Sequence, residues 1–503
     1  MKKNHLLTAL TIGLFLSGFT TLSAQNTTFR LSDYKNPDYL YQSLDLNFGL
    51  ASNASYNKLT GFNDGNRKSF SLNTQAGASY SRYLNSAKAQ GEFWSYFNAG
   101  IGSTSGNYQN TNGTSNIENK VNSSNHKEYL DLTGLRRFYN PKQGYIEING
   151  ALTIDNRGNS ESQKVWQNNT LNTSQETKDK DFYNQVSGSF LIGKGRIEQV
   201  QDARMALYVL DDLGALNREK RAVTDEDVVA LAQLMTKLKY KRFFDYRLRK
   251  IAEITAIDSL LQQSGIVSAA DAAYFTSLND NWAYANNPVR QTGHRIYTGL
   301  EAGFNYNYQY EKMDNNFPED LVGERTTKNK MAALKLVVGY AYEKPTSRSW
   351  QNFAHVKGGV GIQQYYQNRV NNIEPDPEIE TEFYTDVTPA IDFSGDCGFG
   401  YYPNSRTWLN LSWYLNSSWQ TLNEGETKSD KPDHTNSFNI YTGPQFSAYF
   451  YLSEKLRLNL SYNAQFYYKH DNFETETEGV TDKEYDNTYW GQAVNASLTY
   501  SLF

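Results

Sequence analysis

The segment from Lys455 to Lys469 alternates apolar and polar residues without a break. On one parity lie Leu456, Leu458, Leu460, Tyr462, Ala464, Phe466 and Tyr468, and on the other lie Arg457, Asn459, Ser461, Asn463, Gln465 and Tyr467. Successive side chains of a strand point to opposite faces, so this segment has one apolar face and one hydrogen-bonding face. Strands of soluble proteins commonly have about 5–6 residues. The alternation here runs through about 14 residues, which is typical of a strand tilted across a bilayer.

The same alternation recurs along the chain and predicts about fourteen strands. We expect six of them within residues 44–195 and the others within residues 289–503. In the first strand, for example, Leu44, Leu46 and Phe48 alternate with Asp45 and Asn47. The alternation is least regular over residues 128–139.

The N-terminus has the features of a secretory signal peptide. Lys2 and Lys3 precede an apolar run from Leu6 to Phe19, and a small-residue exit ends at Ala24. This order of charged, apolar and small-residue regions is typical of a cleaved export signal. We therefore assign residues 1–24 to a signal peptide, and residues 25–43, which lack a clean period, to a short periplasmic lead-in.

Aromatic residues are enriched although the chain as a whole is not hydrophobic. The sequence has 38 Tyr, 26 Phe and 8 Trp, which make 14% of its residues, while hydrophobic residues reach only 39%. After the signal peptide no stretch approaches the roughly 18 consecutive apolar residues of a membrane helix. Aromatic girdles of a barrel fit this composition better than a large dry core does. The alternative is a secreted soluble sandwich or solenoid, which the strand length and the aromatic content disfavour.

Residues 196–288 change to a helical period. Apolar residues recur there at spacings of three and four, at Ile197, Val200, Ala203, Leu207 and Leu210. Thr224 with Asp227 predicts a helix start, Gly265 a helix end, and Ser268 with Asp271 another start. We expect three or four helices in this insert.

Short and long connections alternate along the predicted strands. The short turns lie at Asn85, Asn140, Lys344, Pro403 and Ser453, and long polar segments join the other neighbouring strands. Outer-membrane barrels have short periplasmic turns, long external loops and an even number of strands. Backbone groups in lipid have no water to bond, so the sheet is expected to close on itself. The predicted fold is an all-β transmembrane antiparallel barrel of about 14 strands, with an α-helical periplasmic insert between strands six and seven.

In its signal peptide, its alternating strands and its final aromatic Phe503, the chain resembles the porin-like class of Gram-negative outer-membrane β-barrels. The resemblance implies an outer-membrane location, contact with outer-membrane lipid, and recognition of the C-terminal strand by the barrel-assembly machinery. One feature departs from this class, because the apolar parity of the last strand, which includes Leu498 and Leu502, is one residue off Phe503.

The polar parity of the strands predicts which charged side chains line the lumen. The candidates are Asp45, Glu92, Glu147, Arg295, Glu301, Lys335, His355, Lys357, Asp392, Asp396 and Arg457. Around an open lumen these charges would tune the selectivity for ions and solutes. Alternatively, opposite charges pair across a narrow lumen and close it.

The densest basic run of the chain lies in the insert. It comprises Lys237, Lys239, Lys241, Arg242, Arg247, Arg249 and Lys250, interleaved with aromatic residues. These residues are candidates for docking a periplasmic protein or an anionic glycan. The alternative is an amphipathic helix with a solvated basic face.

Residue patterns for catalysis are absent from the sequence. His434 and His470 each adjoin an aspartate near external loops, but no nucleophile or second carboxylate accompanies them at a catalytic spacing. Cys397 is the single cysteine, which excludes an intramolecular disulfide and a cysteine-based zinc site. The net charge of -5 gives no reason to expect nucleic acid as a partner. We expect neither an enzyme nor a cofactor.

These observations lead to two functional expectations. The first is a channel or transport protein for small polar solutes, in which the helical insert is a gate or plug. The second is a structural or secretion-associated scaffold of the outer membrane, whose insert docks a periplasmic partner or a surface glycan.

Overall fold

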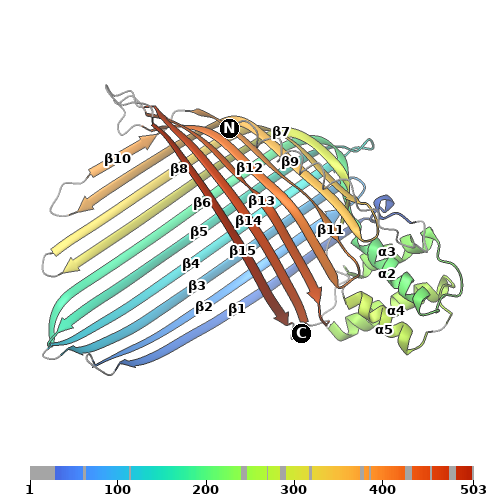
Figure 1. Ribbon diagram of the computed structural model, residues 1–503, viewed down its shortest axis with the longest axis horizontal. Helices are drawn as coiled ribbons and strands as arrows, with labels where there is room; N and C mark the ends of the chain where they lie inside the picture. Colours follow the sequence, from blue (N-terminus) through green and yellow to red (C-terminus); the bar gives the residue numbers. More distant parts are fainter. Residues whose placement is uncertain are drawn as a thin grey trace.

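The computed structural model is one curled antiparallel sheet with a helical insert at one end (Figure 1). It describes residues 29–59, 64–112, 115–239, 246–268, 270–283, 290–316, 320–373, 379–384, 387–424, 433–453, 456–474 and 483–500. The predicted signal peptide, residues 1–24, and the terminal Phe503 lie outside this part of the chain.

The first block of strands precedes the insert. It consists of β1 (Tyr39–Leu59), β2 (Asp64–Asn85), β3 (Ala89–Asn112), β4 (Ser115–Tyr139), β5 (Gly144–Gln167) and β6 (Thr170–Gln199). The second block follows the insert and consists of β7 (Gln291–Asn316), β8 (Asp320–Pro345), β9 (Trp350–Ile373), β10 (Ile379–Tyr384), β11 (Thr388–Tyr401), β12 (Thr407–Glu424), β13 (Asp433–Tyr451), β14 (Leu456–Glu474) and β15 (Lys483–Tyr500).

Every strand pairs antiparallel with its neighbour in the chain, apart from a short side branch. The path runs from β1 to β9 and then from β11 to β15, while β10 pairs only with β9. This path has 14 strands, and the insert follows β6. The predicted fold class, an antiparallel β-sheet of about 14 strands with a helical insert between strands six and seven, is therefore confirmed.

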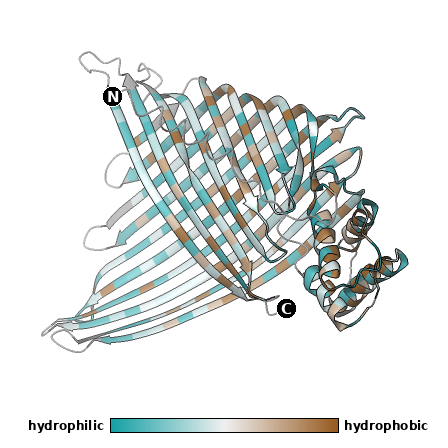
Figure 2. Cartoon of the chain, turned by 45° about the vertical axis from the view of Figure 1, so that its right-hand side comes forward, coloured by the Kyte–Doolittle hydropathy of each residue, from teal (hydrophilic) through white to brown (hydrophobic). Residues whose placement is uncertain are grey.

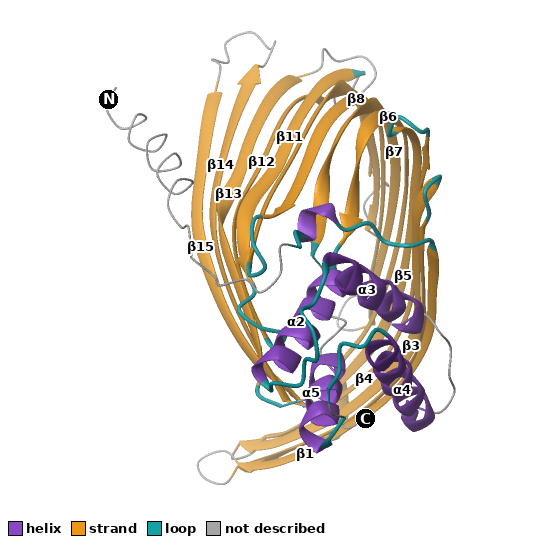
Figure 3. Ribbon diagram, turned by 90° about the vertical axis from the view of Figure 1, so that its right-hand side faces the viewer, coloured by secondary structure: helices purple, strands orange, loops and turns teal. Residues whose placement is uncertain are grey.

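The sheet has two free edges in the described ladders. β1 pairs only with β2, and β15 pairs only with β14, so no ladder of the described residues closes the sheet as expected from the sequence. Figure 3 nevertheless shows the sheet curled around an enclosed space, seen from the end that carries the helices. β1 runs away from this insert end and β15 returns to it, so the two edges have the relative direction that an antiparallel closing ladder needs.

The sheet presents its apolar side chains to the outside. Along β8, Leu336 is 54% exposed and the next residue, Val337, is 1% exposed. The same parity of outward apolar residues recurs on the other strands, and Figure 2 shows the resulting alternation of hydropathy along them. The other face, called the inner face below, carries side chains that reach each other over an intervening strand, as Lys335 of β8 and Asp392 of β11 do. Such contacts are expected on the concave side of a curved sheet.

Most of the polar segments expected as long loops are strand. β3 continues to Asn112 and β4 begins at Ser115, so the expected loop between them is an extended hairpin. β5 and β6 are joined through Asn168 and Asn169, whose φ angles of 52° and 66° match a two-residue type I′ turn. Both faces of these hairpins are polar, so hydropathy does not alternate there, although the backbone ladder continues.

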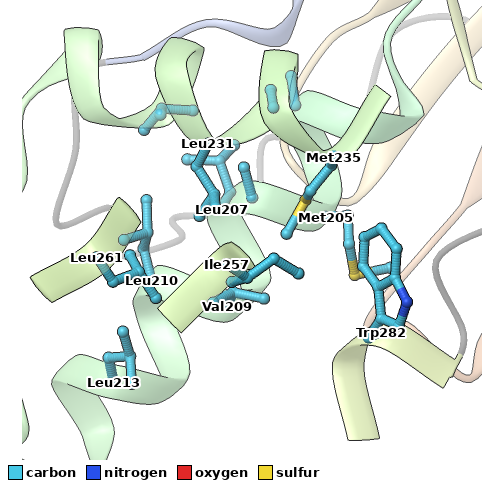
Figure 4. Packing of buried hydrophobic residues seen from close by; sticks show 14 of the residues in the cluster. Met205, Leu207, Val209, Leu210, Leu213, Leu231, Met235, Ile257, Leu261 and Trp282 are labelled. Atoms are coloured by element: carbon cyan, nitrogen blue, oxygen red, sulfur yellow. The ribbon is translucent and has the colours of Figure 1, made fainter. Parts of the chain in front are cut away.

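The described residues of the insert form four helices, α2 (Gln201–Ala215), α3 (Asp225–Lys239), α4 (Tyr246–Gln263) and α5 (Ala272–Ala283). They pack around a hydrophobic core of buried side chains that includes Leu207, Leu231, Met235 and Ile257 (Figure 4). Phe29, Leu31 and Tyr34 are buried in the same core, so the N-terminal segment, with the short η1 (Leu31–Asp33), is part of the insert rather than only a lead-in.

The predicted helix boundaries in the insert are partly confirmed. The backbone N–H of Thr224 donates to Asp227 Oδ2 over 2.9 Å, and that of Asp227 donates to Thr224 Oγ1 over 3.4 Å, as in a capping box. Gly265, with φ of 66°, follows the end of α4 as predicted. The start of α5 was wrongly placed at Ser268, because Asp271 caps it by accepting the N–H of Tyr274. Ile197 was also misassigned, since it lies in β6.

No described helix combines the length and apolar character needed to cross a membrane.

Candidate functional site

All eleven charged residues expected in the lumen lie on the inner face. Each occupies the strand parity opposite to the exposed apolar side chains; Asp45, for instance, lies between Leu44 and Leu46, which both point outward. The remaining members of this set are Glu92, Glu147, Arg295, Glu301, Lys335, His355, Lys357, Asp392, Asp396 and Arg457. Their position is a structural fact, while a role in solute passage is a prediction.

Eight of these residues form ion pairs along one part of the inner face, which is the wall of the enclosed space. Glu301 pairs with Lys357, Lys335 with Asp392, and Glu147 with Arg137. Arg295 Nη1 lies 4.0 Å from Glu147 Oε2. His355 lies 3.2 Å from Asp396 and 3.3 Å from Glu343.

These pairs run along the wall and do not cross the enclosed space. The partners named above lie on adjacent strands or on strands separated by one other strand. Gly359 makes one of these longer contacts feasible, because a Cβ built at this position would lie 2.9 Å from Asp392 Oδ2. Among the described residues, this arrangement does not correspond to charges that pair across and block the lumen.

A polar recess of about 190 Å³ opens in this part of the wall. Its lining includes Glu147, Arg295, Glu301 and Lys357, together with Arg137. Asp45 on β1 and Arg457 on β14 lie away from this cluster, whereas Glu92 lies on β3, beside the strand of Arg137. Arg457 has its guanidinium 5.7 Å from the ring centre of Tyr449.

The insert is docked onto the short turns at one end of the sheet. Asp211 of α2 pairs with Arg348 in the turn between β8 and β9. Asp280 of α5 pairs with Arg406 in the turn between β11 and β12. The Tyr208 hydroxyl donates to the carbonyl oxygen of Tyr402 over 3.0 Å.

Two buried guanidiniums complete this docking interface. Arg204 of α2 and Arg290, which precedes β7, have their guanidinium carbons 5.5 and 4.7 Å from the ring centre of Tyr402. Arg290 donates to Ser347 O over 3.0 Å and to Trp350 O over 2.7 Å. Burial, together with the nearby charge of Arg204, lowers the pKa of Arg290 to about 10. Its several backbone acceptors hold the insert's C-terminal connection against the turn between β8 and β9.

The N-terminal segment crosses the same end of the sheet. η1 contacts β7 and β8, and Asn36 Nδ2 donates to Gln199 O over 2.5 Å. The backbone N–H of Ala87, in the turn between β2 and β3, donates to Asp38 Oδ1 over 3.0 Å. Arg196 of β6 also donates to Ser86 O over 2.9 Å in that turn. Figure 3 shows the four helices in front of part of the enclosed space, so the insert lies partly across this end, beside the N-terminal segment.

The basic run of the insert is partly engaged within the insert itself. Lys239 pairs with Asp202, and Arg249 Nε lies 2.7 Å from Glu253 Oε1. Lys237 is exposed and Lys250 is half-buried. Lys241 and Arg242, with the side chain of Arg247, fall outside the described part of the chain. Partner docking at this run stays a prediction.

The docking interface was missed in the sequence. Its residues are Arg204, Tyr208, Asp211, Asp280, Arg290, Arg348, Tyr402 and Arg406. They are single polar side chains in helices and turns far apart in the chain, and no periodicity marks them. The one signal in the sequence is the short length of these turns. It indicates that the turns lie at the same end of the sheet as the insert, but not which of their residues contact it.

No protein-family model and no curated protein sequence matches this chain. Among solved structures, the chain is similar to the translocator domain of the autotransporter NalP from Neisseria meningitidis, with 10% sequence identity and a TM-score of 0.21. The alignment covers 89% of this chain and 95% of the NalP domain. At this TM-score the similarity adds nothing to the fold described above.

Proposed function

We propose that this protein is a β-barrel channel of a Gram-negative outer membrane, which passes small polar solutes and is gated by its helical insert. The observation that carries the proposal is the docking interface, which holds the insert over one end of a sheet with a charged inner face and an apolar outer face. The outer face supports this location, because exposed apolar side chains that alternate with a polar inner face are stable against lipid. We assign no catalytic role.

The gate opens in this proposal when the insert leaves the turns. Only two ion pairs, Asp211–Arg348 and Asp280–Arg406, join α2 and α5 to these turns in the described part of the chain, alongside the Tyr208 hydrogen bond and the packing on Tyr402. Partly exposed ion pairs are weak and sensitive to salt. The interface is therefore suited to reversible release. The wall charges would then act on the solute in the open pore.

Single-channel recording in planar bilayers tests the proposal. The key variant carries Asp211→Asn and Asp280→Asn, and its matched control carries Asp225→Asn and Glu226→Gln on the exposed start of α3, with the same change in charge. We expect the wild type and the control to be mostly closed, and the key variant to open more often, as should a deletion of residues 200–290.

Silence of every protein, with folding shown by heat-modifiable gel mobility, would contradict the channel. It would favour the scaffold that recruits a periplasmic partner or glycan through its insert. Equal open conductance in all proteins would support a pore and contradict gating by the insert.

A further inference from the structure

A basic and aromatic patch lies on the outward face of the sheet. A belt of outward apolar side chains, called the apolar band below, lies between this patch and the end of the sheet that carries the insert. Within the band, one row of side chains across five neighbouring strands is wholly apolar, and consists of Ile148, Phe190, Leu300, Leu336 and Val360. On β7 the outward apolar side chains run from Ile296 to Phe304. This length is close to the roughly 9–11 residues that a tilted strand needs to cross the hydrocarbon of a bilayer.

The outward residues change character immediately beyond Phe304. The next row across β7, β8 and β9 is Tyr306, Lys330 and Tyr366. The row after it is Phe182, Tyr308 and Lys328 on β6, β7 and β8, followed by Lys180, Tyr310 and Thr326. Aromatic residues at the edge of the band match an interfacial girdle, so the lysines lie at the depth of lipid headgroups.

Four lysines of this patch are exposed, namely Lys178, Lys180, Lys328 and Lys330. Lys180 and Lys330 lie 5.9 and 5.2 Å from the ring centres of Tyr310 and Tyr366, which hold the two amines near the surface of the sheet. β6, β7 and β8 present no carboxylate in the three rows named above, all of whose residues the structure describes.

The carboxylates of these strands begin farther from the band. Lys312, in the row of Lys178, is paired with Glu324 over 2.7 Å, and Glu176 and Asp314 form the next row. Two flanking carboxylates lie nearer the band but on strands outside these three: Glu128 of β4 accepts a hydrogen bond from Asn156 of β5 over 2.6 Å, and Glu380 of β10 accepts one from Asn368 of β9 over 2.8 Å. Along β6, β7 and β8, the part of the patch nearest the band therefore carries lysines and no carboxylate.

We propose that this patch binds the phosphate groups of the glycolipid in the outer leaflet of the membrane. The inference rests on the outer-membrane location proposed above and deepens it by naming a specific lipid contact. Neighbouring strands lie about 4.8 Å apart, so the four amines can contact more than one phosphate on a phosphorylated sugar headgroup. A soluble phosphate ligand fits less well, because the lysines adjoin the apolar band rather than a cavity.

The test measures binding of bisphosphorylated lipid A to the full-length protein in detergent micelles by native mass spectrometry. The key variant replaces Lys178, Lys180, Lys328 and Lys330 by Gln. Its control replaces four exposed lysines at or near the insert end by Gln, namely Lys88, Lys142, Lys220 and Lys344. Wild type and control should bind lipid A alike, and the key variant about tenfold or more weakly, because each lysine near an anionic lipid surface contributes to affinity.

Three further ligands identify the source of the phosphate. Dephosphorylated lipid A should bind no better to the wild type than to the key variant, and neither phosphatidylglycerol nor inorganic phosphate should replace lipid A. Equal binding of lipid A to the wild type and the key variant would overturn the proposal, as would equal preference for phosphatidylglycerol. Because this readout does not depend on conductance, a silent pore that binds lipid A would refute the channel while supporting the patch.

Discussion

Leu231 and Leu336 are the same residue type in opposite surroundings. Leu231 of α3 is 1% exposed in the core of the insert, whereas Leu336 of β8 is 54% exposed on the outside of the sheet. The inner face of the sheet carries Lys335 and Glu301 instead. The insert therefore gains stability by removing apolar side chains from water, while the sheet leaves them to be covered by another apolar medium. The chain thus combines an insert that is stable in water with a sheet whose outer face is stable against lipid.

The same truncation should have unequal effects in the two parts. Leu231→Ala removes a fully packed side chain and leaves a cavity, so it should destabilise the insert by about 2–5 kcal/mol. Leu336→Ala leaves no cavity, because lipid or detergent fills the space, and should cost about 1 kcal/mol. Urea unfolding followed by the helical signal at 222 nm reports on the insert, and heat-modifiable gel mobility reports on the sheet. Equal effects of the two substitutions would contradict this difference between the insert and the sheet.

A charged side chain should be tolerated on the inner face of the sheet and not on its outer face. Leu336→Arg places a guanidinium in the middle of the apolar band and should destabilise the protein in lipid vesicles by about 2–4 kcal/mol. Lys335→Arg, one residue away on the inner face, keeps the charge beside Asp392 and serves as the control. Reversible unfolding in vesicles measures both. An equal free energy of unfolding for Leu336→Arg and the control would indicate that the outer face meets water, which contradicts its placement against lipid.

A smaller effect concerns the pH dependence of the insert. Hydrogen bonds from Arg221, and then from Thr224, lower the pKa of Asp227 below its usual value of 3.8. A carboxyl whose pKa is lower in the folded state stabilises the fold at neutral pH, and this contribution is lost as the pH falls below that usual value. Thermal unfolding at 222 nm should therefore show a decline in stability from about pH 5 to about pH 2 that is smaller in Asp227→Asn. An unchanged decline in the variant would contradict this role.

The strand positions could be predicted because the alternation of apolar and polar residues is local. The segment Leu44–Leu50 alternates where one face meets an apolar medium, and its predicted parity matches the exposed residues of the structure. Beyond the band, the alternation of hydropathy ends while the ladder continues, so the hairpin of β3 and β4 was expected as a loop. The alternation of apolar and polar residues therefore predicts where the apolar band of the outer face lies, but not where the strands end.

The docking interface depends on tertiary structure and has no comparable local signal. Asp211 and Arg348 are brought together only when the strands of the second block place the turn between β8 and β9 beside α2. Phe29 and Leu31 likewise join the core of the insert from a distant part of the chain. Residues 25–43 have no clean period, so nothing in the sequence identifies the insert as the partner of Phe29 and Leu31.

The accessibility of spin labels along β8, measured on the protein in lipid vesicles, reports directly on whether the outer face of the sheet meets lipid. Single cysteines at positions 333–338 would be labelled in a Cys397→Ser background, because Cys397 is exposed. Positions 334, 336 and 338, where Leu334, Leu336 and Val338 point outward, should collide often with oxygen and rarely with a water-soluble nickel complex. Positions 333, 335 and 337 should not share this lipid signature. Nickel access at the outward positions, or a signal without a two-residue period, would contradict a sheet whose outer face meets lipid.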